Sequence, residues 1–238
     1  MPRFVRALLV LAVPLALVAA GAWYLSGQFD PAPPPRSPHG RLVVLVSFDQ
    51  LRGDYPARWA ALFGDDGFER FKADGVWFAD AHLPYAVTTT GPGHAAASTG
   101  APPSVHGIVA NDWFDRGQGK AVYCVTPDRP YERVPPRPGG GRSEGGMSPE
   151  RLLSPTVGDA LAAATGGKGR TFSLALKDRT AVLLGGRRPT GCYCFDSSSG
   201  EFVTSTYYRE RPHQWVESFN TGRRRAAEPT RPRPPRGR

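Results

Sequence analysis

The chain is organised around Thr88-Thr89-Thr90-Gly91-Pro92-Gly93-His94, followed by Ala95-Ala96-Ala97-Ser98-Thr99-Gly100. Pro92 presets the backbone of a first helical turn, and the alanines behind it favour a helix. The free N–H groups of that helix would point back at Thr90, where the helix dipole favours negative charge. A hydroxyl held there is equipped to attack a phosphoryl group. The competing interpretation is that a threonine simply caps an ordinary alanine-rich helix.

A continuous run of apolar residues lies upstream, at residues 41–46 (RLVVLV). Valine-rich runs of this length are typical of parallel strands buried on both faces, so we predict a central strand here. Asp49 follows directly, in the sequence Ser-Phe-Asp-Gln. Because ligand sites in open α/β sheets lie at the carboxyl ends of the strands, Asp49 is a candidate functional residue. Its alternative role is to cap the turn that follows.

Farther along, strand and helix patterns alternate, which indicates an α/β fold with a mostly parallel sheet flanked by helices. Helical patterns cover residues 55–63, 67–73, 156–164 and 213–219, and strand patterns cover residues 76–81 and 171–176. Two hairpins are expected, one joining residues 111–115 to 120–125 and the other joining 191–195 to 201–206. Residues 126–149 are rich in Pro and Gly, and we expect them to form a polar surface excursion.

The two ends of the chain differ in composition from its middle. Residues 1–25 have two arginines before an apolar run, which is the pattern of a secretory signal peptide and is also just long enough for a membrane anchor. Residues 26–40 form a stiff proline-rich linker, and the Arg/Pro-rich residues 221–238 are expected to be disordered. The folded part would then be residues 41–220, in a periplasmic or extracellular protein that is either released or anchored in the inner membrane.

The formal net charge of +9 is concentrated at these ends. Residues 221–238 contain seven arginines and one glutamate, and two more arginines lie near the N-terminus. The folded body is therefore nearly neutral, and a basic face for nucleic acid is not implied. We expect no nucleic-acid partner.

The chain has three cysteines, Cys124, Cys192 and Cys194. Cys192 and Cys194 would share one face of a strand, where a bond between them would be strained, whereas pairing of Cys124 with one of them is open. A zinc site on this Cys-x-Cys pair lacks partner ligands in the sequence. Buried or paired structural thiols are the expectation.

Several polar residues have an ordinary structural explanation singly but suggest a binding site when they are taken together. Asn111 by itself fits a turn, and Lys177 and Arg179 fit a solvated strand end. Combined with Asp49 and Thr90, they suggest a phosphate site. A carboxylate and a hydroxyl would bind a metal, while Lys and Arg would hold phosphate oxygens, Arg in a bidentate manner.

Several motifs follow one another along the chain: Val43-Val44-Leu45-Val46-Ser47-Phe48-Asp49-Gln50-Leu51-Arg52-Gly53-Asp54-Tyr55, Pro92-Gly93-His94-Ala95, Val105-His106-Gly107-Ile108, Asn111-Asp112-Trp113-Phe114-Asp115-Arg116, Leu176-Lys177-Asp178-Arg179 and Thr204-Ser205-Thr206-Tyr207-Tyr208. Motifs in this order resemble the alkaline phosphatase superfamily and, more narrowly, the phosphate-irrepressible (PafA-type) alkaline phosphatases, near the nucleotide pyrophosphatase/phosphodiesterases. The resemblance extends from about Leu42 to Asn220.

The resemblance implies a role for each candidate residue. Thr90 is similar to a nucleophile that is activated by metal and forms a phosphothreonine intermediate. Asp49 matches the first zinc-binding aspartate, so Asp49 and Thr90 would be metal ligands. Asn111 matches an amide that contacts a phosphoryl oxygen, and Lys177 and Arg179 match the pair that recognises a phosphate monoester. The implied cofactor is two Zn²⁺ ions, and the implied substrate is a phosphate monoester.

The sequence also departs from this family. Of six protein zinc ligands, five lie downstream of the matching segment and have no counterpart here, and the motif pattern assigns none of the histidines to replace them. We therefore expect a truncated chain that is weakly active or inactive. The alternatives are a phosphodiesterase or nucleotide pyrophosphatase of the same fold, and a non-catalytic envelope protein whose basic tail binds polyanions.

Overall fold

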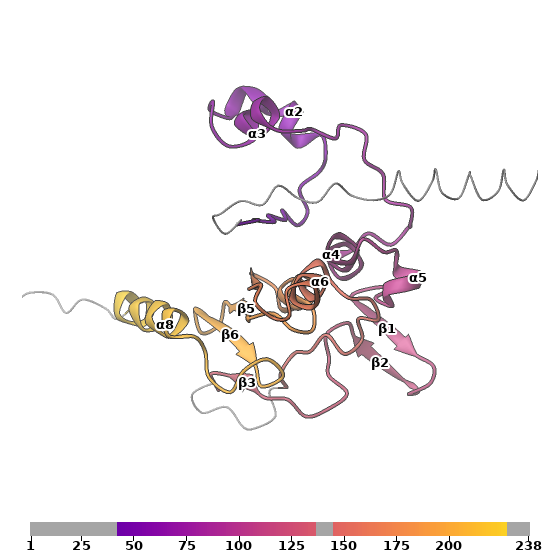
Figure 1. The fold of residues 1–238 in the computed structure, drawn as a ribbon, viewed down its shortest axis with the longest axis vertical. Coiled ribbons are helices and arrows are strands. Elements are labelled where there is room, and N and C mark those ends of the chain that lie inside the picture. Colours follow the sequence, from indigo (N-terminus) through magenta and orange to yellow (C-terminus); the bar gives the residue numbers. More distant parts are fainter. Residues whose placement is uncertain (1–41, 137–144, 228–238) are drawn as a thin grey trace, which may run out of the picture. The chain divides into compact units, whose positions relative to one another are not determined.

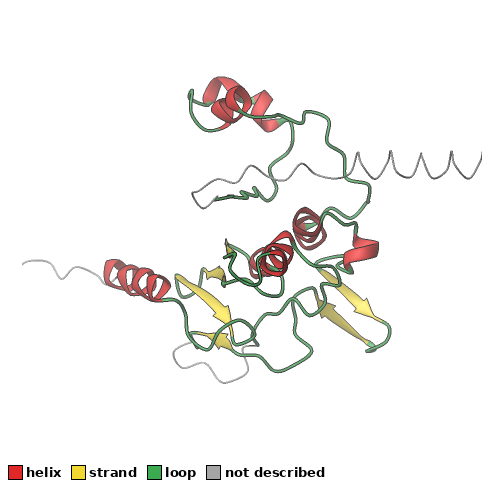
Figure 2. Cartoon of the chain, viewed as in Figure 1, coloured by secondary structure: helices red, strands yellow, loops and turns green. Residues whose placement is uncertain are grey.

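The computed structural model describes residues 42–136 and 145–227. The chain divides into two compact units, Met1–Val46 and Ser47–Arg238, and its helices and strands are drawn in Figures 1 and 2. The expected signal peptide or membrane anchor and the linker, at residues 1–40, lie outside the described residues. Within the described ranges, no helix combines the length and the apolar character that crossing a membrane requires.

The predictions of strands at residues 41–46 and 76–81 are wrong. Residues 42–46 have no regular secondary structure, and their side chains are between 59 % and 87 % exposed. Residues 76–81 also lack a strand, and Val76 and Phe78 are each 79 % exposed. An apolar run becomes a strand only where another backbone accepts its hydrogen bonds, and no described strand pairs with either segment.

The main sheet has four strands in the order β3-β6-β5-β4. β4 (Phe172–Ala175) is parallel to β5 (Gly191–Asp196), with Ser173 opposite Cys192. β5 and β6 (Glu201–Ser205) form the expected antiparallel hairpin, and β6 pairs with β3 (Arg133–Val134) in the antiparallel sense. The α/β class is confirmed, but the described sheet is mixed and has one parallel pair.

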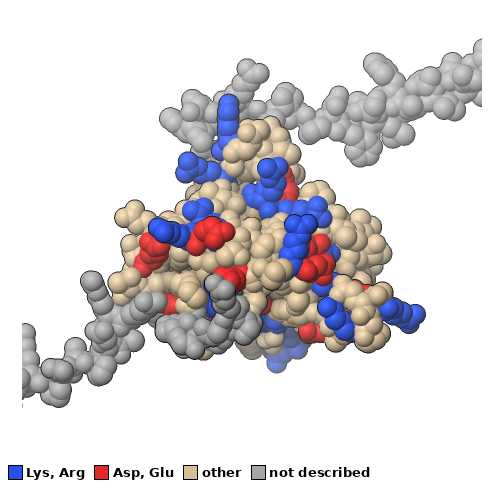
Figure 3. Space-filling model, turned by 90° about the horizontal axis from the view of Figure 1, so that it is seen from below, with Lys and Arg blue, Asp and Glu red and all other residues tan. Residues whose placement is uncertain are grey.

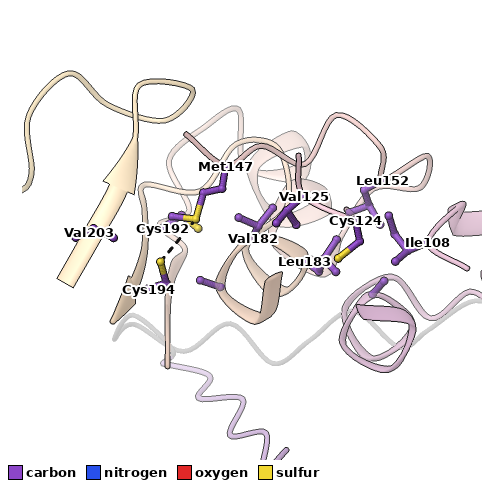
Figure 4. Packing of buried hydrophobic residues seen from close by; sticks show 12 residues of the cluster. Ile108, Cys124, Val125, Met147, Leu152, Val182, Leu183, Cys192, Cys194 and Val203 are labelled. Atoms are coloured by element: carbon purple, nitrogen blue, oxygen red, sulfur yellow. Dashed lines mark hydrogen bonds between the residues drawn. The ribbon is translucent and has the colours of Figure 1, made fainter. Parts of the chain in front are cut away.

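Helix α7 (Asp178–Gly185) connects the two parallel strands and packs against both of them and against α4 (Thr90–Thr99). Its residues Ala181, Val182 and Leu183 are fully buried. They belong to the hydrophobic core shown in Figure 4, which also includes Ile108 and Leu152. Helix α7 therefore fixes the carboxyl end of β4 relative to the start of α4 through shared apolar packing.

The other predicted helices and the first hairpin are confirmed. β1 (Asp112–Asp115) pairs with β2 (Lys120–Tyr123) in the antiparallel sense. Thr156 caps its helix reciprocally with Asp159, whose backbone N–H donates to the Thr156 hydroxyl at 3.2 Å. The remaining described helices are α2 (Tyr55–Arg58), η1 (Ala60–Leu62), α3 (Phe68–Asp74), α5 (Pro103–His106), α6 (Val157–Ala164) and α8 (Gln214–Ala227).

Two predicted boundaries differ from the structure. Helix α8 continues past Asn220 to Ala227, so the expected disorder does not begin at residue 221, and residues 228–238 lie outside the described part. Asn220 itself exchanges two hydrogen bonds of 2.9 Å with the backbone of Phe202 and so ties this helix to β6. The excursion at residues 126–149 contains β3 and the buried Met147, so it contributes to the sheet and the core.

All three cysteines are buried and free, as the interpretation of structural thiols predicted. Burial raises the pKa of the Cys124 and Cys194 thiols to about 12 in each case, so both stay neutral. The Cys194 thiol lies 3.8 Å from the Met147 sulfur, the contact dashed in Figure 4.

Candidate active site

Thr90 is the first residue of α4, and Thr89 occupies the N-cap position. The Thr90 hydroxyl therefore is not used as a cap. It donates a hydrogen bond to Oδ2 of Asp49 at 3.3 Å, and the residue is 9 % exposed. The helix begins here because the Thr89 carbonyl accepts from the Gly93 N–H at 3.0 Å, which closes the first turn.

Asn111 lies beside this first turn. Its Oδ1 accepts a hydrogen bond of 2.7 Å from the N–H of Gly91, one of the free donors of the helix. With the oxygen engaged in this way, the Nδ2 group of Asn111 is left as a donor. A Cβ at Gly91 would be crowded, because it would lie 3.2 Å from the Ala110 carbonyl and 3.3 Å from the Cys124 sulfur.

Asp49 is held between the start of helix α4 and the residue Lys177 that follows strand β4. Its Oδ2 accepts from the Nζ of Lys177, which follows β4, as well as from Thr90. Burial alone would raise the pKa of Asp49, but the Lys177 ammonium and the Thr90 hydroxyl hold it below its ordinary value. Asp49 is therefore an ionised carboxylate next to the Thr90 hydroxyl.

His94 joins the segment that carries Asp49 to the helix that carries Thr90. The ring Nδ1 lies 2.8 Å from the carbonyl oxygen of Thr90, and Nε2 lies 3.0 Å from the hydroxyl of Ser47. The residue is only 5 % exposed. Since the Thr90 carbonyl accepts only, Nδ1 donates to it, and the ring fixes the position of Ser47 relative to α4.

Arg179 is held by Tyr123 of β2. The phenol donates to Oδ1 of Asp178 at 2.6 Å and accepts from Nη1 of Arg179 at 3.0 Å. Burial and the Asp178 carboxylate raise the pKa of Tyr123, so the phenol stays neutral. The Nε of Arg179 is buried and has no hydrogen-bond partner among the described residues. A buried cationic donor without an acceptor is one that an anion can satisfy.

Four of the five residues that the sequence singled out, Asp49, Thr90, Asn111 and Lys177, are linked by hydrogen bonds at the start of α4. Thr90 and Lys177 each donate a hydrogen bond to Asp49, and Asn111 accepts one from Gly91, the residue after Thr90. Among the described residues, Arg179 makes no hydrogen bond or ion pair with these four; it is held by Tyr123, whose neighbour Cys124 donates its backbone N–H to the Asn111 carbonyl at 2.8 Å. Sequence reasoning missed Tyr123, since a tyrosine in a strand carries no distinguishing pattern.

The donor set falls short of a metal centre by itself. Within residues 42–136 and 145–227, no group of three or more His, Cys, Asp or Glu side chains is placed to hold an ion. Asp49 and the Thr90 hydroxyl would supply two oxygens, whereas zinc in proteins takes four ligands. The described residues therefore do not form a complete zinc site.

Charge on the surface is mixed. Figure 3 shows one face on which Lys and Arg side chains alternate with Asp and Glu side chains. Oppositely charged side chains also form ion pairs among the described residues, such as Arg151–Asp128 at 2.7 Å. On this face there is no extended basic patch of the kind that binds nucleic acid.

Comparison with known proteins identifies the family. A family model described as type I phosphodiesterase / nucleotide pyrophosphatase matches residues 43–230. The chain belongs to this family. It is 38 % identical over 200 residues to alkaline phosphatase PafA of Elizabethkingia meningoseptica, a match that covers 84 % of this chain and 36 % of the relative. It is 39 % identical over 183 residues to alkaline phosphatase PhoV of Synechococcus elongatus, covering 77 % of this chain and 32 % of the relative.

The fold of this phosphodiesterase-family chain is also similar to part of a solved relative. The crystal structure of wild-type PafA matches with a TM-score of 0.69 and 39 % identity, covering 73 % of this chain and 33 % of that one. The chain spans about a third of the length of the relatives it matches. The predicted kinship with PafA-type alkaline phosphatases is confirmed.

Proposed function

We propose that this chain provides the nucleophilic and phosphate-binding part of a phosphomonoesterase, with Thr90 as the residue that takes the phosphoryl group. The observation that carries the proposal is the contact of the Thr90 hydroxyl with an ionised carboxylate that is itself paired with Lys177. A nucleophilic oxygen, a helix N-terminus and cationic donors then meet at one place, which is the arrangement that phosphoryl transfer needs.

Each residue has a part in this chemistry. Asp49 accepts the hydrogen bond that orients the Thr90 hydroxyl, and Asn111 Nδ2 and the unpartnered Nε of Arg179 donate to phosphoryl oxygens. Lys177 has three donors and spends one on Asp49, so it can also bind an oxygen. The bond from phosphorus to Thr90 forms as the bond to the alcohol breaks, and water later releases phosphate from the phosphothreonine.

A second solved structure supports the assignment of Thr90, Asn111, Lys177 and Arg179 to the site. It is a PafA variant with substitutions at a threonine, an asparagine, a lysine and an arginine. The threonine and asparagine are separated in that sequence as Thr90 and Asn111 are here, and the lysine and arginine as Lys177 and Arg179 are. The same residue types at the same separation within each pair favour one shared site.

Zinc is the cofactor we propose for the complete site, with Asp49 and Thr90 as the ligands that this chain supplies. Two oxygens do not satisfy two zinc ions, so the described residues need further ligands, and we assign no step to the metal. We also propose that the chain works outside the cytoplasm, because residues 1–25 have the pattern of a signal peptide or anchor.

The proposal favours monoesters over diesters. A monoester dianion carries charge on an oxygen that is alkylated in a diester, and two cations, Lys177 and Arg179, flank the site. A phosphodiesterase is the second candidate, since the family that matches residues 43–230 is described by that activity.

Equilibrium binding tests this preference without requiring turnover. Calorimetry would compare phenyl phosphate, a monoester, with methyl phenyl phosphate, a diester. We expect wild type to favour the monoester by about two orders of magnitude, and Lys177→Met and Arg179→Met each to remove most of that preference. Lys168→Met and Arg170→Met, at exposed positions, are the matched controls. Equal binding of both probes to wild type would contradict the monoester assignment.

A further inference from the structure

Asp178 places a negative charge beside the two cations of the proposed phosphate site. It lies between Lys177 and Arg179 in the sequence, and all three residues line one cavity of about 320 Å³. A carboxylate in this position opposes phosphate binding in two ways, because it repels the anion and because it can pair with a cation that the anion needs. Phosphate binding here therefore depends on which groups engage the Asp178 carboxylate.

The Asp178 carboxylate is engaged through its Oδ1 atom by two neutral donors. Oδ1 accepts a hydrogen bond of 2.6 Å from the Tyr123 hydroxyl and one of 2.7 Å from the backbone N–H of Arg179. Within the described residues, no ion pair joins Asp178 to a Lys or Arg side chain. The carboxylate of Asp178 and the guanidinium of Arg179 are thus adjacent in the sequence but do not pair with each other.

The Tyr123 hydroxyl also binds the guanidinium. Its oxygen accepts a hydrogen bond of 3.0 Å from Nη1 of Arg179, while Nε of Arg179 is buried and has no hydrogen-bond partner among the described residues. A phenol has one proton to donate and lone pairs to accept with, so Tyr123 gives its proton to Asp178 and a lone pair to Arg179. One neutral group therefore lies between the two opposite charges and satisfies both.

We propose that Tyr123 is a positioning residue that prevents Asp178 from neutralising Arg179, so that the guanidinium stays available to the phosphate. The inference rests on the proposed function, which places a phosphate oxygen on Arg179. Without the hydroxyl, Oδ1 of Asp178 would lose a donor and Nη1 of Arg179 would lose its acceptor. Two opposite charges on adjacent, partly buried side chains would then pair directly. Tyr123 acts through Arg179 and does not itself line the cavity.

The aromatic ring of Tyr123 offers a competing explanation. Its centroid lies 6.0 Å from the guanidinium carbon of Arg179, at the outer limit for attraction between a cation and a ring face. Tyr123→Phe keeps this ring contact and removes only the hydroxyl. If the ring alone held Arg179, this substitution would not change phosphate binding.

Calorimetry of the full chain with inorganic phosphate tests the proposal. We expect Tyr123→Phe to weaken binding about tenfold, the effect of about one lost hydrogen bond to a charged group. Adding Asp178→Asn to Tyr123→Phe should restore the affinity to within about threefold of wild type, because an amide does not neutralise a guanidinium. Tyr131→Phe is the matched control and should bind as wild type does. The Tyr131 hydroxyl also donates to a carboxylate, that of Glu150 at 3.3 Å, and neither residue lines the cavity.

The positioning role and the phosphate site can fail separately. If Arg179→Met weakens phosphate binding but Tyr123→Phe leaves it unchanged, the positioning role is wrong and the phosphate site stands. If Tyr123→Phe and its double variant with Asp178→Asn bind equally weakly, the hydroxyl only supports the local fold, and the proposal is overturned. If wild type does not bind phosphate, or Arg179→Met binds as tightly as wild type, the proposed function fails at Arg179 and the positioning role fails with it.

Discussion

The hydroxyl of Thr90 lies 3.3 Å from the carboxylate of Asp49, although 41 positions separate the two residues in the sequence. Asp49 also pairs with Lys177, which follows β4. One carboxylate thus links the start of helix α4 with the carboxyl end of a strand. The electrostatics of the site depend on this link.

The first prediction concerns the protonation of Asp49. Burial favours the neutral acid, and the Lys177 ammonium reverses that effect. In Lys177→Met we therefore expect the pKa of Asp49 to rise from below its ordinary value to that value or above it. Carboxyl ¹³C shifts followed by NMR between pH 2 and pH 7, in wild type and variant, measure the change. An unchanged titration would mean that the ion pair does not form in solution.

The second prediction separates the two functions of the Asn111 amide. Asn111→Ala removes the acceptor for the Gly91 N–H and should lower the free energy of unfolding by about 1–3 kcal/mol. Asn111→Asp keeps an acceptor oxygen but replaces the Nδ2 donor with negative charge, so it should retain most of the stability and lose phosphate binding. Urea unfolding and phosphate calorimetry on both variants give the two readouts. Equal loss of stability in both would show that Oδ1 is not the acceptor.

The third prediction concerns acid stability. Burial alone would raise the pKa of Asp196, but hydrogen bonds from Ser198 and Ser199 and the charge of Arg133 hold it well below its ordinary value of 3.8. Since the folded pKa is lower than the unfolded one, this carboxylate stabilises the fold above pH 3.8 and loses that contribution as the pH falls further. Unfolding by urea from pH 6 to pH 2 should show a steeper loss below pH 4 for wild type than for Asp196→Asn. If the stabilities of wild type and Asp196→Asn fell in parallel with pH, Asp196 would not be the source of the acid sensitivity.

The fourth prediction concerns turnover. The chain supplied with excess zinc should hydrolyse phenyl phosphate slowly or not at all, because the two proposed ligands, Asp49 and Thr90, are too few for a metal whose affinity depends on ligand number and geometry. A release assay with wild type and Thr90→Ala measures this. Rapid turnover by wild type that is abolished in Thr90→Ala would contradict the claim that the chain has too few zinc ligands for activity.

Local signals in the sequence were enough to predict helix α4 and the two hairpins. The Gly-Pro-Gly turn and the alanines after it predicted α4, and Asp196 to Gly200 lie at the turn between β5 and β6. The order of motifs predicted that Asp49, Thr90 and Lys177 would meet. These features depend on short-range preferences or on a family pattern that the chain shares.

Long-range pairing was not predictable in the same way. Residues 42–46 have the composition of a buried strand, but composition does not supply a pairing partner, and they are exposed. The two-residue strand β3 could not be predicted from the sequence, because it pairs with β6, which is distant in the chain. Tyr123 was missed as the support of Arg179 because that role depends on a contact between residues 56 positions apart.

The most direct test of the central claim is an NMR titration of the ¹⁵N-labelled chain with inorganic phosphate. If Thr90 lies in a phosphoryl site, the Gly91 amide, the Asn111 side-chain amide and the Arg179 Nε–H should shift together along one saturating curve, and Lys177→Met should weaken that curve at all three. Shifts confined to the arginines of residues 223–238, or an absence of shifts at these three groups, would contradict the account.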